Sequence, residues 1–230
     1  MTKRYGQLTA LNDVGFSIRP GEILGLIGPN GSGKTTLFEC MAGVLAPTAG
    51  CLLFQGGLLS PHSRRRTLFY LPDAVTPWPA QTVRWALDFA IGFLGGRRDR
   101  LDAVIERLAL APLLASAIGA LSKGQRKRVL LAIGLLTAQP LLLADEPFEG
   151  LDLRQSRDVA AALRDHAAGG RTLFLSIHQI VDAARICDRF VLLSGGKVCG
   201  EGTLAELTEL ARAANAATAG NLEEVFLALT

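Results

Sequence analysis

The sequence predicts one α/β domain with a mostly parallel central sheet and an inserted α-helical subdomain. Short, nearly continuous apolar runs alternate with segments of helical periodicity, which is the pattern of a sheet with helices on both faces. Between about residues 82 and 137 the strand signal vanishes and only helical periodicity remains. The chain has 230 residues and is 49% hydrophobic, which suffices for one well-cored domain.

Five apolar runs are the expected core strands: residues 23–27, 68–71, 141–144, 172–177 and 190–193. Helices are expected after Gly33, Gln125, Arg154 and Gln179. In the inserted segment, apolar residues recur at helical spacing: Val83, Leu87, Ile91 and Leu94, then Leu101, Val104, Ile105 and Leu108. We therefore expect residues 1–81 and 138–230 to form the sheet core and residues 82–137 the helical subdomain. A last helix with Leu222, Val225, Phe226 and Leu229 on one face is expected to pack on the chain's own core.

The cysteine content and the length of the apolar runs exclude several kinds of site and of protein. The sequence has four cysteines: Cys40, Cys51, Cys187 and Cys199. No Cys-x-x-Cys spacing occurs, so we expect buried thiols rather than a zinc site or disulfides. The densest apolar stretch, residues 129–144, is interrupted by Thr137, Gln139 and Pro140, so it is too short to span a bilayer.

The N-terminal six residues lack the apolar core of a signal peptide. We therefore expect a cytoplasmic protein, in which any role at the membrane requires a separate partner. The net charge of +3 is small and the basic runs at residues 64–66 and 97–98 are short. These features favour a solvated surface over a nucleic-acid interface, so no nucleic-acid partner is expected.

A phosphate-binding loop is predicted between the first expected core strand and the helix after it. Residues 28–35 match the pattern G-x-x-x-x-G-K-[ST] and are Gly28, Pro29, Asn30, Gly31, Ser32, Gly33, Lys34 and Thr35. Glycines let the backbone aim several N–H groups at one anion, and the helix adds its positive N-terminal end. We expect Lys34 to reach the β- and γ-phosphates, Thr35 to ligate Mg²⁺ and Thr36 to hydrogen-bond a phosphate oxygen.

Two adjacent acids follow the apolar run at residues 141–144. Ligands of parallel sheets bind outside the carboxyl ends of the strands, so Asp145 and Glu146 are expected at the same edge as the phosphate loop. Asp145 is suited to the Mg²⁺ shell, and Glu146 to polarising an attacking water, because phosphoryl transfer depends on positioning and charge neutralisation. His178 ends the run at residues 172–177 and can hydrogen-bond a γ-phosphate.

A third motif, residues 121–125 (Leu-Ser-Lys-Gly-Gln), lies between the phosphate loop and the acids. Ser122 and Gln125 form a capping box that opens a helix. Arg126, Lys127 and Arg128 crowd its first turns, where cations oppose the helix dipole. We interpret this arrangement as a surface that awaits an anionic ligand.

The order of these motifs, followed by Gly150, Leu151, Asp152 and then His178, resembles the ATP-binding cassette (ABC) ATPases across nearly the whole chain. The resemblance implies a P-loop NTPase (RecA-like) core with an antiparallel N-terminal β portion. It implies ATP and Mg²⁺ as cofactors and two subunits that face each other head to tail. Lys34, Glu146 and His178 would act in catalysis, and Tyr5 would stack on adenine. The residues that would contact the nucleotide of the other subunit, or link the two sites, are Ser122, Lys123, Gly124, Gln125 and Asp152.

Three features depart from the pattern of the family. Glycine is usual where Lys123 stands, so Lys123 would add a positive charge near the partner's phosphate. Glutamine is usual at Asp73, which we expect to act as a metal ligand together with Thr35 and Asp145, since a carboxylate binds a hard cation. The N-terminus is short, so either an edge strand is absent or the true start lies upstream.

Two functions remain open from the sequence. The first is an ATP-hydrolysing subunit that dimerises, as a homodimer or heterodimer, and powers a separately encoded transmembrane permease from the inner face of the cell membrane. The segment at residues 73–79, with Trp78, would lie where such subunits grip the permease, and residues 222–226 resemble the exporter branch. The alternative is a soluble ABC ATPase outside transport, for example in cofactor assembly. A binding protein without hydrolysis is disfavoured because Glu146 is present.

Overall fold

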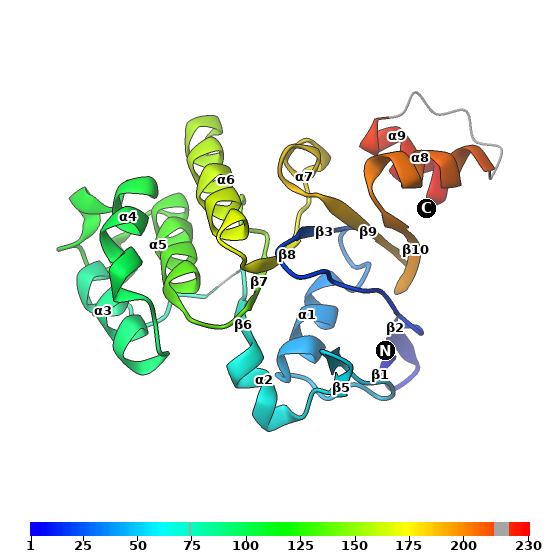
Figure 1. Ribbon diagram of the computed structural model, residues 1–230, viewed down its shortest axis with the longest axis horizontal. Coiled ribbons are helices and arrows are strands. Elements are labelled where there is room, and N and C mark those ends of the chain that lie inside the picture. Colours follow the sequence, from blue (N-terminus) through cyan, green and yellow to red (C-terminus); the bar gives the residue numbers. More distant parts are fainter. Residues whose placement is uncertain (74, 214–220) are drawn as a thin grey trace.

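A six-stranded sheet forms the centre of the molecule (Figure 1). The computed structural model describes residues 1–73, 75–213 and 221–230. The strand order is β10-β9-β3-β8-β7-β6, and every neighbouring pair is parallel except β9 and β10. The strands are β3 (Ile23–Ile27), β6 (Leu68–Leu71), β7 (Leu141–Asp145), β8 (Thr172–Ser176), β9 (Arg189–Ser194) and β10 (Lys197–Gly202). The predicted α/β class with a mostly parallel sheet is confirmed. The five expected core strands are present to within one residue at each end.

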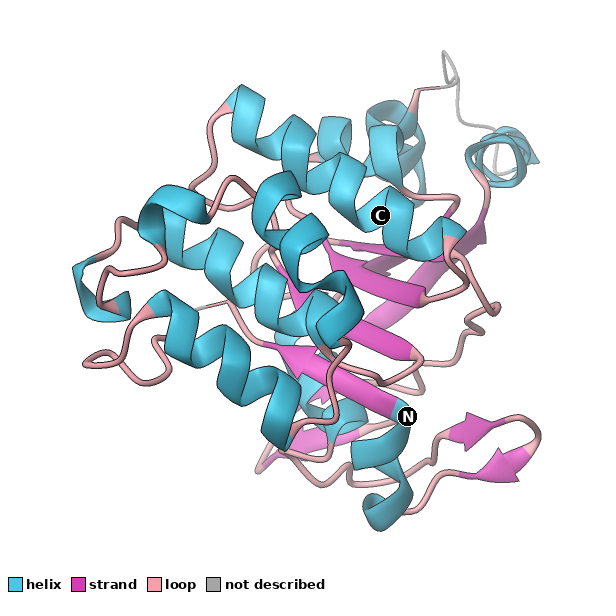
Figure 2. Ribbon diagram, turned by 60° about the vertical axis from the view of Figure 1, so that its left-hand side comes forward, coloured by secondary structure: helices cyan, strands magenta, loops and turns pink. Residues whose placement is uncertain are grey.

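The alternation of side chains along the strands divides the core into two apolar clusters. In β3, Ile23 and Ile27 face one cluster, whereas Leu24 and Leu26 face the other. The first cluster contains α5 (Lys123–Leu136), α6 (Leu153–Ala168) and α7 (Ile180–Ile186). The second is covered by α1 (Lys34–Ala42). Figure 2 shows most of the helices gathered on one side of the magenta strands.

The chain between β6 and β7 forms helices in its described part, and these lie together at one end of the molecule (Figure 1). They are α3 (Val83–Phe93), α4 (Leu101–Arg107) and α5, with short 3₁₀ turns at Arg98–Arg100, Ala111–Leu113 and Ile118–Ala120. The apolar residues that predict α3 and α4, including Val83, Leu87, Leu101 and Val104, are buried as expected. Helices α5 and α6 begin earlier than expected because Ser122 and Asp152 are their N-caps.

The far end of α5 is fixed by a buried arginine that precedes β8. Arg171 is 8% exposed. Its Nη1 donates to the carbonyls of Gly134 (2.8 Å) and Leu135 (3.0 Å), and its Nη2 donates to Thr137 Oγ1 (2.8 Å). A guanidinium that satisfies the last carbonyls of a helix complements the helix dipole. Burial and the nearby Arg100 lower the pKa of Arg171 to about 10, which leaves it charged at neutral pH.

Smaller elements surround this core. β1 (Lys3–Tyr5) and β2 (Leu8–Leu11) form an antiparallel hairpin, as do β4 (Leu53–Phe54) and β5 (Gly57–Leu58). α2 (Pro61–Thr67) precedes β6, and α8 (Leu204–Ala213) follows β10. The last helix, α9 (Leu222–Leu229), buries Leu222 and Val225 in the core, which confirms its expected packing.

In the described ranges, no helix is long and apolar enough to cross a bilayer. The four cysteines carry free thiols, and Cys40 and Cys187 are buried as expected. The expectation of burial is wrong for Cys51, which is exposed, and for Cys199, which is half-buried. Cys51 lies on the segment before β4, and Cys199 lies on the edge strand β10, where it packs against the first core cluster.

Candidate nucleotide site

The phosphate loop connects β3 to α1 in a conformation that requires glycine. Gly33 caps α1 with φ 105°, a left-handed conformation. A Cβ atom there would lie 2.7 Å from the carbonyl oxygen of Ala10. Since the first N–H groups of a helix have no intrahelical acceptor, the N-terminal turn of α1 directs donors at the space beside this loop.

The ammonium of Lys34 lies inside the loop. Its Nζ donates to the carbonyls of Gly28 (2.8 Å) and Pro29 (3.3 Å) and lies 4.0 Å from Glu146 Oε1. The side chain is 8% exposed. A buried cation amid backbone dipoles is a ready partner for an anion that enters the loop.

Asp145, the last residue of β7, is bound from two sides. Thr35 Oγ1 donates to Asp145 Oδ2 at 2.8 Å, and the Ser176 hydroxyl donates to Asp145 Oδ1. Ser176 lies opposite Asp145 in the parallel register of β7 and β8. The predicted metal ligands Thr35 and Asp145 are therefore in direct contact.

Glu146 turns away from Asp145 because its backbone leaves the strand with φ 48°. Its N–H donates to Ser176 Oγ (3.0 Å), and its Oε2 accepts from the backbone N–H of His178 (3.0 Å). Burial raises the pKa of Glu146, and the positive charge of Lys34 opposes that rise in part. A carboxylate that binds protons more tightly than usual is a better proton acceptor.

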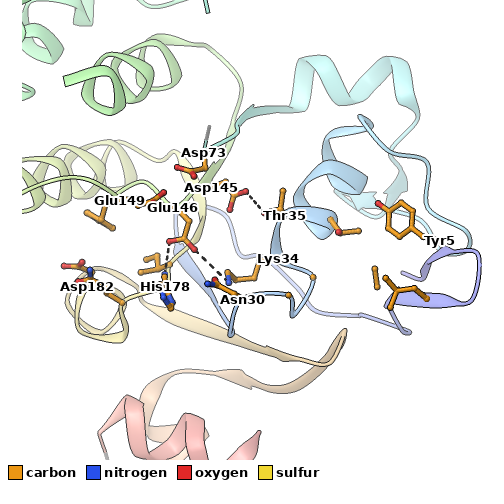
Figure 3. A pocket seen from close by; sticks show the side chains of 18 residues that line it. Tyr5, Asn30, Lys34, Thr35, Asp73, Asp145, Glu146, Glu149, His178 and Asp182 are labelled. Atoms are coloured by element: carbon orange, nitrogen blue, oxygen red, sulfur yellow. Dashed lines mark hydrogen bonds and ion pairs between the residues drawn. The ribbon is translucent and has the colours of Figure 1, made fainter. Parts of the chain in front are cut away.

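One cavity of about 560 Å³ gathers most of the predicted site (Figure 3). The predicted residues that line it are Tyr5, Asn30, Gly31, Gly33, Lys34, Thr35, Thr36, Asp73, Asp145, Glu146 and His178. Tyr5 lies on the N-terminal hairpin at the far side of the cavity, and Lys3 Nζ is 4.9 Å from its ring centroid. Lys34, Glu146 and His178 lie close together.

The remaining predicted residues lie outside the lining. Gly28, Pro29 and Ser32 complete the loop behind it, and the Ser32 hydroxyl is buried without a hydrogen-bond partner in the described structure. The residues of the 121–125 motif and Asp152 are also absent from the lining: Ser122, Lys123, Gly124, Gln125 and Asp152. The structure thus brings the phosphate loop, the acids and His178 together, and leaves the 121–125 motif elsewhere on the same chain.

The 121–125 motif opens α5 with the predicted capping box. Gln125 N donates to Ser122 Oγ (3.3 Å), and Ser122 N donates to Gln125 Oε1 (2.9 Å). The start of this helix packs tightly on the loop before α6, because a Cβ atom at Gly124 would lie 2.7 Å from the carbonyl oxygen of Gly150. Asp152 caps α6 in the same way, through Gln155.

The cations at the start of α5 have acceptors in their own chain. Arg126 donates to Thr76 Oγ1 and the Leu121 carbonyl, Lys127 to Asp73, and Arg128 to the Leu108 and Ala109 carbonyls. These contacts explain why cations are tolerated at the start of α5, and the arrival of an anionic ligand there stays a prediction. Lys123 is held as well, by Glu149 at 2.6 Å.

Asp73 borders the cavity but is paired with Lys127. Lys127 Nζ lies 2.5 Å from Asp73 Oδ1. Partial burial raises the pKa of Asp73, but the hydrogen bond from Lys127 and the charges of Lys127 and Lys123 outweigh it, so the pKa lies below its ordinary value. Asp73 is therefore an anion at neutral pH, with one oxygen committed to an ammonium.

The donor set fits Mg²⁺ and a polyphosphate. Thr35 and Asp145 offer hard oxygen ligands, and the buried, unpartnered Ser32 hydroxyl offers a hydrogen bond beside the loop. Among the described residues, no group of three or more His, Cys, Asp or Glu forms a metal cage. Mg²⁺ is typically held in this way, by one or two protein oxygens together with substrate phosphates.

Sequence reasoning missed four polar residues of the site: Ser176, Glu149, Gln179 and Asp182. Ser176 could have been found, since it precedes His178 by two residues on a predicted strand beside the one that ends in Asp145. Glu149 and Asp182 carry no comparable signal, because their positions depend on how the loop after β7 and helix α7 fold over the cavity.

Comparison with known proteins agrees with this geometry. A sequence profile of the family described as "ABC transporter" matches residues 11–149. The chain belongs to this family. The ABC motifs of the sequence thus lie in an ABC fold, and the predicted P-loop NTPase core with its antiparallel N-terminal β portion is confirmed.

Two relatives and one solved structure show the range of the ABC proteins it resembles. Nod factor export ATP-binding protein I of Rhizobium etli is 33% identical over 88% of this chain and 66% of its own length. Thiamine import ATP-binding protein ThiQ of Salmonella typhimurium is 33% identical over 84% of each chain. A structure described as an ATP-binding subunit of an ABC transporter superposes with a TM-score of 0.88 at 29% identity, covering 99% of this chain and 96% of that one. The chain thus spans about two thirds of the Nod factor relative and most of the other two.

Proposed function

We propose that this chain, as one domain over residues 1–230, binds and hydrolyses ATP and powers transport through a separate membrane-spanning subunit. The observation that carries the proposal is the single cavity that gathers Lys34, Thr35, Asp145, Glu146 and His178. The names of the relatives support it, since they are ATP-binding proteins of export and import systems.

The chain's own residues account for hydrolysis by positioning and charge. The N–H groups at the start of α1 and Lys34 would hold the phosphates, and Thr35 and Asp145 would hold Mg²⁺, which would neutralise charge on the transferred phosphoryl group. Glu146, held by the backbone N–H of His178, accepts a proton from the attacking water. The His178 side chain is exposed at the rim of the cavity and donates to the γ-phosphate.

The cavity is incomplete as a catalytic site in one chain, because Ser122 and Gly124 lie outside it. We infer that a second ABC subunit, in the simplest case another copy, covers the nucleotide with its Ser122, Lys123, Gly124 and Gln125. Asp152 then links the two sites. Tyr5, which lines the cavity and is 45% exposed, stacks on the adenine ring.

The test of this pairing is a Glu146→Gln variant in ATP and Mg²⁺. Without the proton acceptor, ATP accumulates, so the protein should run as a dimer that retains ATP after gel filtration. A Glu146→Gln/Lys34→Ala variant is the matched control and should remain monomeric. A Glu146→Gln protein that is loaded with ATP yet monomeric contradicts the two-subunit site.

Asp73 is proposed as an auxiliary metal ligand through the carboxylate oxygen that does not bind Lys127. An extra anion beside a triphosphate is favourable only when metal is present. Asp73→Asn should therefore slow turnover while sparing ATP binding. Normal turnover of this variant excludes a metal-linked role.

An aromatic cluster is the proposed contact with the permease. Trp78 packs on Phe89 (centroids 4.9 Å apart) and Trp85 (5.6 Å), and Phe93 continues the stack. Trp78 itself is half-buried, whereas Trp85 is 39% and Phe93 74% exposed. An apolar face of this kind, on α3 and the loop after Asp73, suits an amphipathic segment of a membrane protein.

Contact with a permease would hold the chain at the membrane, whereas the direction of transport is inferred from a different segment. We propose a peripheral location on the inner face of the membrane and export as the direction, which rests on the resemblance of residues 222–226 to exporter subunits. Co-purification of wild-type protein, but not a Trp85→Ser/Phe93→Ser variant, with a polytopic membrane protein supports the assignment. A chain that purifies from its native cells without any membrane protein favours the soluble ABC alternative.

A further inference from the structure

Lys127 is a buried lysine that touches three structural elements. It lies in the second turn of α5, two residues beyond Gln125, and is 5% exposed. Its Nζ lies 2.5 Å from Asp73 Oδ1, 3.5 Å from the Asp73 carbonyl oxygen and 3.5 Å from the Asp145 carbonyl oxygen. One ammonium thus joins the start of α5, the loop after β6 and the carboxyl end of β7.

The location of these partners separates Lys127 from nucleotide binding. Asp73 and Asp145 both line the cavity, whereas Lys127 does not. Its ammonium lies behind the two carboxylate-bearing residues and touches one side chain and two backbone carbonyls. Lys127 can therefore influence the site by placing its neighbours but has no direct contact with a ligand there.

A buried cation so near the N-terminus of a helix is unfavourable by itself. The helix dipole opposes it, and desolvation of an ammonium is costly unless its hydrogen bonds are satisfied. The Asp73 carboxylate and the two carbonyls supply three acceptors, which is the number of donors on an ammonium. The burial of the Lys127 ammonium is therefore stable only while Asp73 keeps its position.

Lys123 extends the same face of α5 by one turn. It precedes Lys127 by four residues, so both side chains lie on one side of the helix. Lys123 pairs with Glu149 at 2.6 Å, and its aliphatic chain crosses Gly150, where a Cβ atom would lie 3.1 Å from Lys123 Cγ and Cδ. This face of α5 thus holds the loop after β6 through Asp73 and the loop after β7 through Glu149.

We propose that Lys127 is a positioning residue for ATP hydrolysis, which fixes the acidic residues of the chain's own cavity relative to the 121–125 motif that opens α5. The inference rests on the proposed function, and Lys127 acts through Asp73 and the end of β7 rather than on the nucleotide. A shift of Asp73 toward a bound metal pulls on Lys127 and therefore on the helix that carries Ser122. Occupancy of the chain's own cavity is thereby linked to how Ser122 is presented to the nucleotide of the second subunit.

The test combines hydrogen exchange of the nucleotide-free protein with steady-state ATP hydrolysis of the full chain. In a Lys127→Met variant, peptides that cover Asp73 and residues 122–128 should exchange at least threefold faster than in wild type. The kcat should fall about tenfold, while the KM for ATP stays within twofold. A Lys127→Gln variant, which keeps a hydrogen-bond donor without the charge, should fall between the two and replaces Lys127→Met if that protein is insoluble.

Arg164→Met is the matched control. Arg164 also pairs two elements, through Asp188 at 2.7 Å, but both side chains are exposed. It should leave exchange at Asp73 and both kinetic constants unchanged. The proposal is overturned if Lys127→Met changes neither exchange nor kcat, if KM rises as kcat falls, or if the control behaves like Lys127→Met. A wild-type protein without ATPase activity refutes the proposed function instead, and the exchange result still tests the placement.

Discussion

Ser176 is expected to contribute both to the stability of the sheet edge and to the rate of hydrolysis. Its hydroxyl donates to Asp145 Oδ1 and accepts from the Glu146 N–H at 3.0 Å. A Ser176→Ala change removes one hydrogen bond to a carboxylate, which contributes about 1.5–3 kcal/mol. The Glu146 N–H still donates to the Ser176 carbonyl oxygen at 3.2 Å. Loss of its bond to the hydroxyl therefore adds only about a few tenths of a kcal/mol. We expect the free energy of unfolding to fall by about 2–3 kcal/mol, and Tm by about 4–12 °C for a chain of this length.

The same change should slow turnover. Without Ser176 Oγ, the Asp145 carboxylate keeps the hydrogen bond from Thr35 but loses the one on its other oxygen, so it can rotate away from the position that suits the metal. If about 1.4 kcal/mol of the lost interaction is felt in the transition state, kcat falls about tenfold. Thermal unfolding without nucleotide and steady-state ATP hydrolysis measure the two effects separately.

Ser156→Ala is the control for Ser176→Ala. Ser156 is also a buried serine, on α6, but it does not line the cavity that holds Asp145 and Glu146. It should unfold and turn over like wild type. If Ser176→Ala matches this control in Tm and kcat, the hydroxyl bridge between Asp145 and Glu146 has no energetic role and the reasoning is refuted.

Three further predictions concern other parts of the chain. Arg189→Met leaves the buried Glu22 without its ion-pair partner and should cost about 3–5 kcal/mol in urea denaturation; a loss below about 1 kcal/mol would contradict it. Burial, then the charges of Arg171 and Arg100, lower the pKa of His166 to about 4 from its ordinary 6.5. The stability that this residue contributes is therefore present above pH 6.5 and lost as pH falls toward 4, and a His166→Gln variant should lack that part of the pH dependence; equal slopes would exclude it. Gly33→Ala places a Cβ atom 2.7 Å from a carbonyl oxygen at a left-handed φ and should weaken ATP binding at least tenfold in a fluorescent-nucleotide titration, whereas wild-type affinity would show that the loop tolerates a side chain.

The core of the fold was predictable because its signals are local. An apolar run followed by glycines and Lys34 indicates β3 and the loop after it. Each of these features can be interpreted without knowledge of distant residues. The hairpin of β4 and β5 escaped prediction for the converse reason. Strands of two residues such as β4 are too short for periodicity, and their exposed Leu53 carries no pattern of burial.

The site residues that belong to a sequence motif were predictable. Those whose role depends on pairing between distant segments were not. Thr35, Asp145 and Glu146 follow from the phosphate loop and the strand that ends beside it. That Lys127 binds Asp73 depends on the packing of α5 against a loop 54 residues away, and nothing local in the sequence indicates it. The contacts that the charges at the start of α5 make within the chain were likewise not predictable, and their role toward a ligand stays a prediction.

The anchoring of α5 by Arg171 has a mechanical consequence. The helix has 14 residues, which at 1.5 Å per residue makes it about 21 Å long. Arg171 fixes the last carbonyls of α5 to the start of β8. The helix can therefore rotate as a rigid rod about this end, with Ser122 at its free end. A rotation of about 5° at the pivot moves the tip by about 2 Å over this length, which is enough to make or break a hydrogen bond. Substitutions at Arg171, far from any phosphate, would therefore be felt most strongly at Ser122.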